Sequence, residues 1–186
     1  MVISVEPVHK CLLSIEKEVG SDSYKIAKVI LMAADGAEYK QKKANKLSEN
    51  EHLILICGHY KGIDERILNY IDEKLSIGDY VLTGGELAAM IVVDSVSRLL
   101  PGVVSDFESV STDSHYDGLL GASCYTRPQE YEGHEVPKVL LEGNHKKIDE
   151  YRFIDSVEKT MKTRPDLYKS YEFSKEELKL IKNIKS

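Results

Sequence analysis

Two glycine-rich stretches stand in the middle of the chain: GHYKGIDERI over residues 58–67 and SIGDYVLTGG over residues 76–85. One glycine alone marks a turn, but glycines that gather at predicted strand ends indicate that backbone approaches a ligand, or other backbone, closely. Apolar residues lie between these glycines, together with the aromatic side chains of Tyr60 and Tyr80. Such a lining fits a flat aromatic ligand that main-chain hydrogen bonds hold in place.

Short apolar runs and helical patterns alternate on either side of these stretches. The runs at residues 28–33, 52–57 and 80–83 predict strands, closed in turn by Asp35-Gly36, Gly58 and Gly84-Gly85. Residues 7–19 predict a helix that Gly20 ends, residues 41–49 a surface helix, and residues 86–100 a helix so apolar that it should be mostly buried. The pattern predicts an α/β fold with a mainly parallel sheet, which binds ligands outside the carboxyl ends of its strands.

The composition is that of an ordinary globular protein. Of its 186 residues, 42% are hydrophobic and 30% are charged, which excludes collagen-like, low-complexity and wholly disordered classes. The apolar runs are too short to span a membrane, and no secretory signal is recognisable, so we expect no membrane association. The three cysteines form no CxxC pair, which argues against a disulfide framework and predicts a cytoplasmic protein.

Charge and short motifs exclude several kinds of site. The net charge of −6 is uneven, with −7 over residues 1–123 and +1 over residues 124–186, so a polyanion partner would bind the second segment more readily. No GxGxxG follows the first predicted strand, and no GxxxxGK[ST] occurs, which excludes the dinucleotide fingerprint and the P-loop. The six histidines show no metal-ligand spacing, and no metal site is predicted.

The last third of the chain predicts a small helical segment. Residues 105–117 are rich in Ser, Asp, Thr and Glu, as is typical of a linker or mobile loop. Asn144 is a predicted cap for a helix that runs up to Pro165, with an apolar face of Ile148, Tyr151, Ile154, Val157 and Met161. Ser174 and Glu177 form a capping box for a last helix that carries Leu178, Ile181 and Ile184.

Several strings of the sequence together resemble one family. GHYKGIDERI, SIGDYVLTGGELAAMIVVDSVSRLLPGV, YTRP, EVPKVLLEGNH and the final RPDL resemble, in the same order, the bacterial tRNA (guanine-N1)-methyltransferase family TrmD of the SPOUT superfamily. The resemblance covers essentially the whole chain. It implies a knotted α/β domain over residues 1–104 with a C-terminal trefoil knot, a flexible linker over 105–120 and a helical tRNA-binding domain over 121–186. It also implies a homodimer in which the two subunits share each active site.

The resemblance implies a reaction as well: methyl transfer from S-adenosylmethionine to N1 of guanosine 37 in tRNA, where guanosine 36 precedes it. Asp113 would remove the N1 proton and Arg98 would stabilise the charge on O6, while magnesium assistance is an expectation of the family alone. The implied cofactor residues are Leu31, Met32, Gly58, Tyr60, Gly62, Ile77, Gly78, Tyr80, Leu82, Gly84 and Gly85. The implied tRNA contacts are Arg127, Lys146, Lys147, Arg152 and Arg164.

Four departures from the family pattern leave an alternative open. Met1 aligns within the family's N-terminal region, so we expect an upstream strand, helix and glycine-rich loop to be missing, or the start to be misassigned. Lys61 replaces a glutamate, residues 33–36 replace SPQG, and Gly121 and Thr112 replace acidic residues. A positive charge at Lys61 should weaken the binding of a cationic cofactor and lower the activity. The alternative is a truncated, catalytically impaired paralogue that acts as a dimeric binding module for the cofactor or for tRNA.

Overall fold

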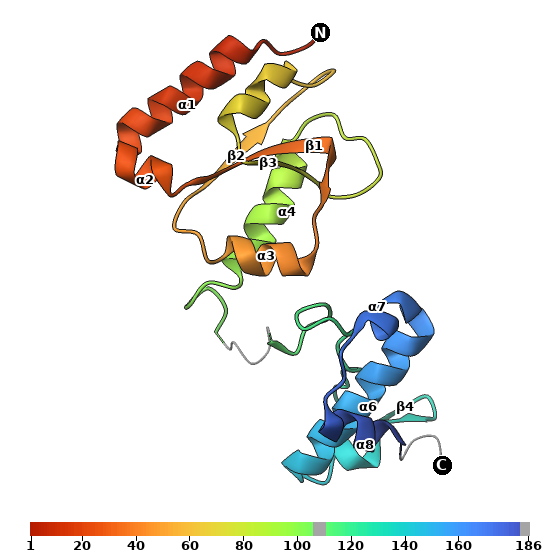
Figure 1. The fold of residues 1–186 in the computed structure, drawn as a ribbon. Helices are drawn as coiled ribbons and strands as arrows, with labels where there is room; N and C mark the ends of the chain where they lie inside the picture. Colours follow the sequence, from red (N-terminus) through yellow and green to blue (C-terminus); the bar gives the residue numbers. More distant parts are fainter. Residues whose placement is uncertain (106–110, 183–186) are drawn as a thin grey trace. The chain divides into compact units, whose positions relative to one another are not determined.

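The computed structural model describes residues 1–105 and 111–182. The chain divides into two compact units, Met1–Phe107 and Glu108–Ser186, each of which is described by itself (Figure 1). The first unit contains α1 (Val5–Val19), α2 (Ser21–Lys25), β1 (Lys28–Glu38), α3 (Gln41–Leu47), β2 (Leu53–Cys57), the 3-10 helix η1 (Glu65–Tyr70), β3 (Glu73–Ser76) and α4 (Glu86–Ser97). Every helix in the described ranges is too short or too polar to traverse a lipid bilayer.

A three-stranded parallel sheet in the order β2-β1-β3 forms the centre of the first unit. On one side of β1 the pairing runs from Lys28 opposite Leu53 to Met32 opposite Cys57, and on the other side Met32 pairs with Leu75. Successive residues of the central strand point to opposite faces, and both faces are covered. The predicted α/β class with a parallel sheet is confirmed.

Helices cover the two faces of the sheet and create two hydrophobic cores. Figure 1 shows α1 on one side of the sheet and α3 with α4 on the other. Ile30 and Met32 of β1 pack into the core with α3 and α4, which contribute Ala44, Leu47, Ala88, Val92 and Val96. Val29 and Leu31 pack into the core with α1 and η1, which contribute Leu12 and Ile67. The helix predicted at residues 41–49 exists as α3, but one side of it is buried against the sheet.

The third strand is not where the sequence predicted it. β3 is Glu73–Ser76, whereas residues 80–83 form no strand. The search for an apolar run missed β3 because the strand begins with two charged residues. The structure pairs the first of them, Glu73, with Lys43 of α3 at 2.7 and 2.5 Å, so the charge is compensated at the sheet edge. After Ser76 the chain turns away at Gly78, whose φ is 149°.

The first strand extends beyond the turn that was predicted at Asp35-Gly36 and ends at Glu38. Met32 and Ala37 both pair with Leu75, so residues 33–36 bulge out of the ladder. Gly36 lies so close to β3 that a Cβ atom there would stand 2.6 Å from the backbone of Leu75. The glycine therefore permits a close approach between two strands and does not end the first one.

Helix α4 is less buried than its apolar sequence predicted. Its buried residues, Ala88, Val92 and Val96, face the sheet. Leu87 and Met90 keep 58% and 64% of their surface exposed, and Ile91 and Val93 are also exposed. The prediction of a mostly buried helix is wrong for the single chain, because only one side of the helix meets the sheet. Exposed apolar residues in such number are typical of an interaction surface, here called the α4 apolar face (Leu87, Met90, Ile91 and Val93).

The second unit is small and largely helical in its described part. It contains β4 (Glu130–Tyr131), β5 (His134–Glu135), the 3-10 helix η2 (Lys138–Leu140), α6 (His145–Thr163), α7 (Pro165–Ser170) and α8 (Lys175–Lys182). β4 and β5 form an antiparallel pair. The core consists of Leu119, Val157 and Ile181, with aromatic residues packed around them: Phe153, Tyr168, Tyr171 and Phe173.

Both predicted helix caps of this unit are confirmed. The side chain of Asn144 accepts a hydrogen bond from the Lys147 amide at 3.3 Å. Ser174 Oγ accepts from the Glu177 amide at 3.2 Å, and the Glu177 carboxylate accepts from the Ser174 amide at 2.7 Å, which is a complete capping box. Ile184 of the predicted last helix lies outside the described residues, as do residues 106–110 of the predicted linker.

The buried face of α6 differs from the predicted apolar face. Val157 is buried as expected, but Met161 is exposed and Thr160 is fully buried in its place. Thr160 Oγ1 accepts a hydrogen bond from the Leu120 amide at 2.9 Å and donates one to the Ser156 carbonyl at 2.7 Å. A polar residue therefore ties residues 119–121 to the helix, and an apolar periodicity could not reveal it.

We expect Thr160→Val to destabilise the second unit by about 2 kcal/mol, because it leaves the Leu120 amide without its acceptor. Urea unfolding of the chain measures the loss. The matched control is Thr163→Val at the exposed end of the same helix, where the change should stay below about 0.5 kcal/mol. Equal effects of the two substitutions would contradict the role given to the Thr160 hydroxyl.

Candidate functional site

The carboxyl ends of the parallel strands lie at one edge of the sheet. Met32 pairs with Cys57, the last residue of β2, and with Leu75 near the end of β3. The segments that follow these two strands, residues 58–63 and 77–85, therefore leave the sheet at the same edge. This is the edge at which open α/β sheets bind their ligands.

Backbone contacts join the two segments directly. The Gly85 amide donates a hydrogen bond to the Gly58 carbonyl at 2.9 Å, and His59 and Gly84 form an isolated antiparallel bridge. A Cβ atom at Gly85 would stand 2.9 Å from Cα of Cys57, and one at Gly84 would stand 2.6 Å from the His59 ring. Larger residues would push the segments apart. We call Gly58, His59, Gly84 and Gly85 the glycine junction; here the predicted approach of backbone to backbone is confirmed.

Two polar side chains at the glycine junction were not singled out from the sequence. His59 Nε2 lies 2.7 Å from a carboxylate oxygen of Glu86, the first residue of α4. A hydrogen bond from the Glu86 amide and the contact with His59 hold the pKa of the Glu86 carboxyl below its usual value. In the sequence, only their positions could have indicated these two residues, because His59 follows Gly58 and Glu86 follows Gly85.

The loop after β3 presents apolar and aromatic side chains to solvent. Ser76 Oγ donates to the Gly78 carbonyl at 3.1 Å, and the Tyr80 ring lies over Gly78, where a Cβ atom would approach it to 2.6 Å. Tyr80, Val81 and Leu82 are exposed, while Ile77 packs against the core beneath. The loop, which directly precedes Gly84 and Gly85, therefore exposes apolar side chains to solvent. A loop that contacts a cofactor needs such side chains.

The other predicted cofactor residues differ in whether their side chains are exposed to a ligand. Tyr60 is 71% exposed with a φ of 63°, and Gly62 has a φ of 102° with open space around it. Leu31 and Met32 lie at the level of the strand ends, but their side chains are buried in opposite cores. Their side chains are therefore turned into the protein interior, and their part in cofactor binding stays a prediction.

The departure at residues 33–36 has a structural consequence. Asp35 forms an ion pair with Lys74 of β3, and Glu65 lies 3.8 Å from the same ammonium group. The hydrogen bond from Lys74 lowers the pKa of the Asp35 carboxyl, and the same bond raises the pKa of Lys74. Asp35 thus fastens the bulge of β1 to β3 beside the strand ends.

The two predicted catalytic residues belong to different units. Arg98 follows α4 as its C-cap in the first unit, where its amide donates to the Asp94 carbonyl at 3.2 Å. Asp113 lies exposed in a turn of the second unit, and its carbonyl accepts from the Tyr116 amide at 3.3 Å. The pairing of the two side chains stays a prediction.

The loop that carries Asp113 is closed by Gly121, one of the departures from the family pattern. The Gly121 amide donates to Ser114 Oγ at 2.8 Å. A Cβ atom at Gly121 would stand 3.1 Å from the Thr112 carbonyl oxygen and 3.2 Å from the Ser114 amide nitrogen. An aspartate at this position would therefore crowd the loop as the structure has it. Glycine at 121 and the present shape of the loop belong together.

The predicted tRNA contacts lie on the second unit. Arg127, Lys146, Lys147 and Arg152 are exposed. Arg164 donates two hydrogen bonds to the carboxylate of Asp166, at 2.9 and 2.6 Å, so much of its charge is already compensated. Of the predicted set, Arg164 is therefore the weakest candidate for an anion partner. Within residues 1–105 and 111–182, no group of His, Cys, Asp and Glu side chains is arranged to hold a metal ion.

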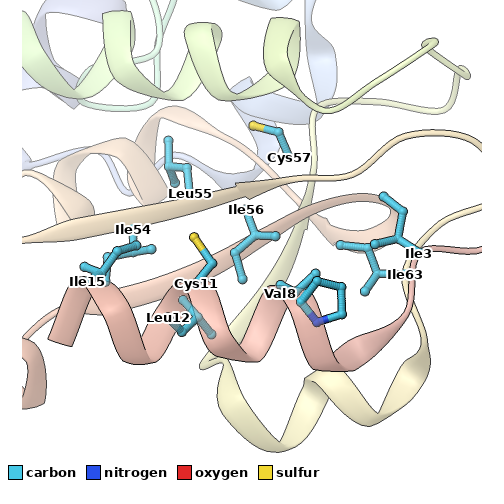
Figure 2. A pocket seen from close by; sticks show the side chains of 11 residues that line it. Ile3, Val8, Cys11, Leu12, Ile15, Ile54, Leu55, Ile56, Cys57 and Ile63 are labelled. Carbon is cyan, nitrogen blue, oxygen red and sulfur yellow. The ribbon is translucent and has the colours of Figure 1, made fainter. Parts of the chain in front are cut away.

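A separate cavity of the first unit lies between α1 and the outer strand β2. It has a volume of about 360 Å³. Figure 2 shows it lined by apolar side chains, among them Val8, Cys11 and Ile15 of α1 and Ile54 and Ile56 of β2. Apart from the thiols of Cys11 and Cys57, the side chains that line this groove are hydrocarbon and offer little to orient a substrate, so the glycine junction is the better candidate for chemistry.

The chain is also similar to known proteins over most of its length. Residues 1–170 match the family described as tRNA (Guanine-1)-methyltransferase TrmD. The chain is 46% identical over 184 residues to the tRNA (guanine-N(1)-)-methyltransferase of Shouchella clausii (strain KSM-K16), covering 99% of this chain and 74% of the relative. It is 47% identical over 186 residues to the proteins of the same name from Bacillus cereus (strain AH820) and Bacillus anthracis (strain CDC 684 / NRRL 3495), covering 100% of this chain and 75% of each relative.

Proposed function

Because the chain belongs to the tRNA (guanine-1)-methyltransferase family TrmD, we propose that it transfers a methyl group from S-adenosylmethionine to N1 of a guanosine in tRNA. One observation carries the proposal: the match runs through nearly the whole chain and includes the glycine junction, where the strand-end segments are held together by backbone. The finer predictions come from the resemblance: guanosine 37 after guanosine 36, magnesium assistance, the trefoil knot, and a helical tRNA-binding domain behind a linker.

The glycine junction and the loop after β3 fit the flat aromatic ring of a nucleoside cofactor. Glycines at positions 58, 84 and 85 keep the backbone free of side chains, and Tyr80 and Leu82 supply exposed apolar surface nearby in the chain. We assign binding of S-adenosylmethionine to these residues, with Tyr60, Gly62, Ile77 and Gly78. When bound, the cofactor supplies a methyl group on a sulfonium cation. The chain has to align the acceptor with that methyl group and to keep water away.

Asp113 and Arg98 would provide the acid–base chemistry. Methylation of guanine at N1 requires removal of the N1 proton, and a carboxylate such as Asp113 can accept it. Negative charge then develops on O6, and the guanidinium of Arg98 can stabilise it. Arg98 is half-buried at the end of α4, and Asp113 is exposed in its turn, where a substrate base can reach it.

The tRNA would be held mainly by the second unit. Arg127, Lys146, Lys147 and Arg152 are exposed cations that can contact phosphates, which position a nucleic acid without reading its sequence. Two exposed tyrosines, Tyr125 and Tyr131, lie in the same part of the chain and can stack on unpaired bases. Exposed cations and aromatic rings together are typical of surfaces that bind loops of RNA.

The α4 apolar face supports the proposed homodimer. Met90 at 64% and Leu87 at 58% exposure would be costly to leave in water, and a second copy of the same face can cover them. Because α4 begins at the glycine junction and ends next to Arg98, a partner on this helix would lie beside both ends of the proposed site. That position supports the predicted sharing of each active site between two subunits.

The main test of the function is methyl transfer to a tRNA transcript that carries guanosines 36 and 37. We expect activity in the unaltered chain and a kcat at least about 100-fold lower in Asp113→Asn, because the amide cannot accept the N1 proton. The KM for tRNA should change little. Asp22→Asn, at an exposed carboxylate on α2, is the control and should keep full activity. Full activity of Asp113→Asn would contradict its role as the base.

Lys61 provides a test of the electrostatics. We expect Lys61→Glu to bind S-adenosylmethionine about threefold to tenfold more tightly, because it removes a positive charge from the segment that meets a sulfonium cation. Isothermal titration at low salt measures the affinity. Lys42→Glu makes the same charge change on α3 and should have little effect. Equal affinities of the Lys61 variant and the unaltered chain would refute the charge argument.

The dimer is tested by sedimentation. We expect the chain to sediment as a dimer at micromolar concentration and Met90→Lys as a monomer, because a lysine in the α4 apolar face would have to be buried without a partner. Leu13→Lys changes an exposed leucine on α1 and should leave the dimer intact. A Met90→Lys protein that is still dimeric would place the interface elsewhere.

A further inference from the structure

We propose that His59 is a positioning residue for the cofactor half of the site: its hydrogen bond to Glu86 holds the Gly84-Gly85 turn against the end of β2. The inference rests on the proposed function, since it concerns the site assigned there to S-adenosylmethionine. In the sequence, the six histidines show no metal-ligand spacing, and the family resemblance implies no role for His59.

The geometry of the glycine junction carries the inference. His59 contacts the second segment twice: its backbone forms the bridge with Gly84, and its Nε2 lies 2.7 Å from the Glu86 carboxylate. The side-chain contact passes over Gly84, where a Cβ atom would stand 2.6 and 2.8 Å from the His59 ring. The absence of a side chain at Gly84 therefore allows the imidazole of His59 to lie there and to reach the Glu86 carboxylate.

The turn needs such a restraint because it is built from two glycines. Glycine loses more conformational entropy on ordering than any other residue, so a Gly-Gly turn opens easily unless other contacts hold it. The backbone contributes the hydrogen bond from the Gly85 amide to the Gly58 carbonyl and the bridge between His59 and Gly84. The N-cap of α4 is Gly85 itself, which has no side chain to cap the helix. The His59–Glu86 contact instead links a side chain of the first turn of α4 to the other segment.

The solvent exposure of His59 and Glu86 limits how strongly their hydrogen bond can stabilise the turn. The two side chains are about half exposed, at 48% and 54%, so their contact is screened by water and its effect should be moderate. Burial, and after it the negative charge of Glu86, raises the pKa of the Cys57 thiol at the end of β2. The pair thus links the end of β2 with the first turn of α4.

The experiment uses the full chain with His59→Ala, His59→Gln and, as a matched control, His52→Ala at the residue just before β2. Amide exchange without ligand is the first readout. In His59→Ala we expect exchange at the Gly85 amide to be about fivefold faster, with α1 and α3 unchanged. The second readout is kinetic: KM for S-adenosylmethionine should rise about fivefold while kcat stays within twofold. His59→Gln keeps a donor near the same place and should restore both values.

Each other outcome overturns the proposal in a distinguishable way. Unchanged exchange and KM in His59→Ala, with a fully active unaltered chain, would remove the positioning role and leave the proposed function standing. A loss in His59→Gln as large as in His59→Ala would show that the ring fills space and that the hydrogen bond is irrelevant. Absence of cofactor binding in the unaltered chain would refute the proposed function and this inference together.

Discussion

The close approach of Gly85 to the end of β2 is the constraint on which the site depends. The Gly85 amide reaches the Gly58 carbonyl at 2.9 Å, and any Cβ at Gly85 would stand 2.9 Å from Cα of Cys57. Two segments that are 27 residues apart in sequence, as His59 and Glu86 are, therefore form one surface at the carboxyl edge of the sheet. The same contact sets where α4 begins, and so it also fixes the position of the α4 apolar face and of Arg98 at the helix end.

Much of this arrangement could be predicted from the sequence, because it depends on residue types whose structural preference is strong on its own, such as glycine, aliphatic residues and helix-capping residues. Gly58 after β2, the apolar runs in β1 and β2, and the capping box of Ser174 and Glu177 all acted as their chemistry predicts. The strand β3 could not be found in this way, since its charged residues become acceptable only through partners such as Lys43, far away in sequence. The roles of Thr160 and His59 could not be predicted for the same reason, because each side chain forms a hydrogen bond with a residue far away in the sequence.

The exposed side of α4 shows another limit of sequence reasoning. A helix that is apolar nearly all round is expected to be buried, but the single chain covers only one side of it. The expectation of burial and the observed exposure agree if a second chain completes the burial. The outer strand β2, whose five apolar residues are only half-buried beside the α1 groove, has the same character. On both surfaces, apolar side chains remain exposed or half-exposed in the single chain.

The central claim is that the glycine junction binds the methyl donor, and amide exchange of the chain with and without S-adenosylmethionine tests it most directly. The account predicts that the cofactor slows exchange over residues 58–62 and 77–85, on both sides of the junction, and leaves the α1–β2 groove unchanged. Protection confined to that groove, or no protection at any amide at saturating cofactor, would contradict it.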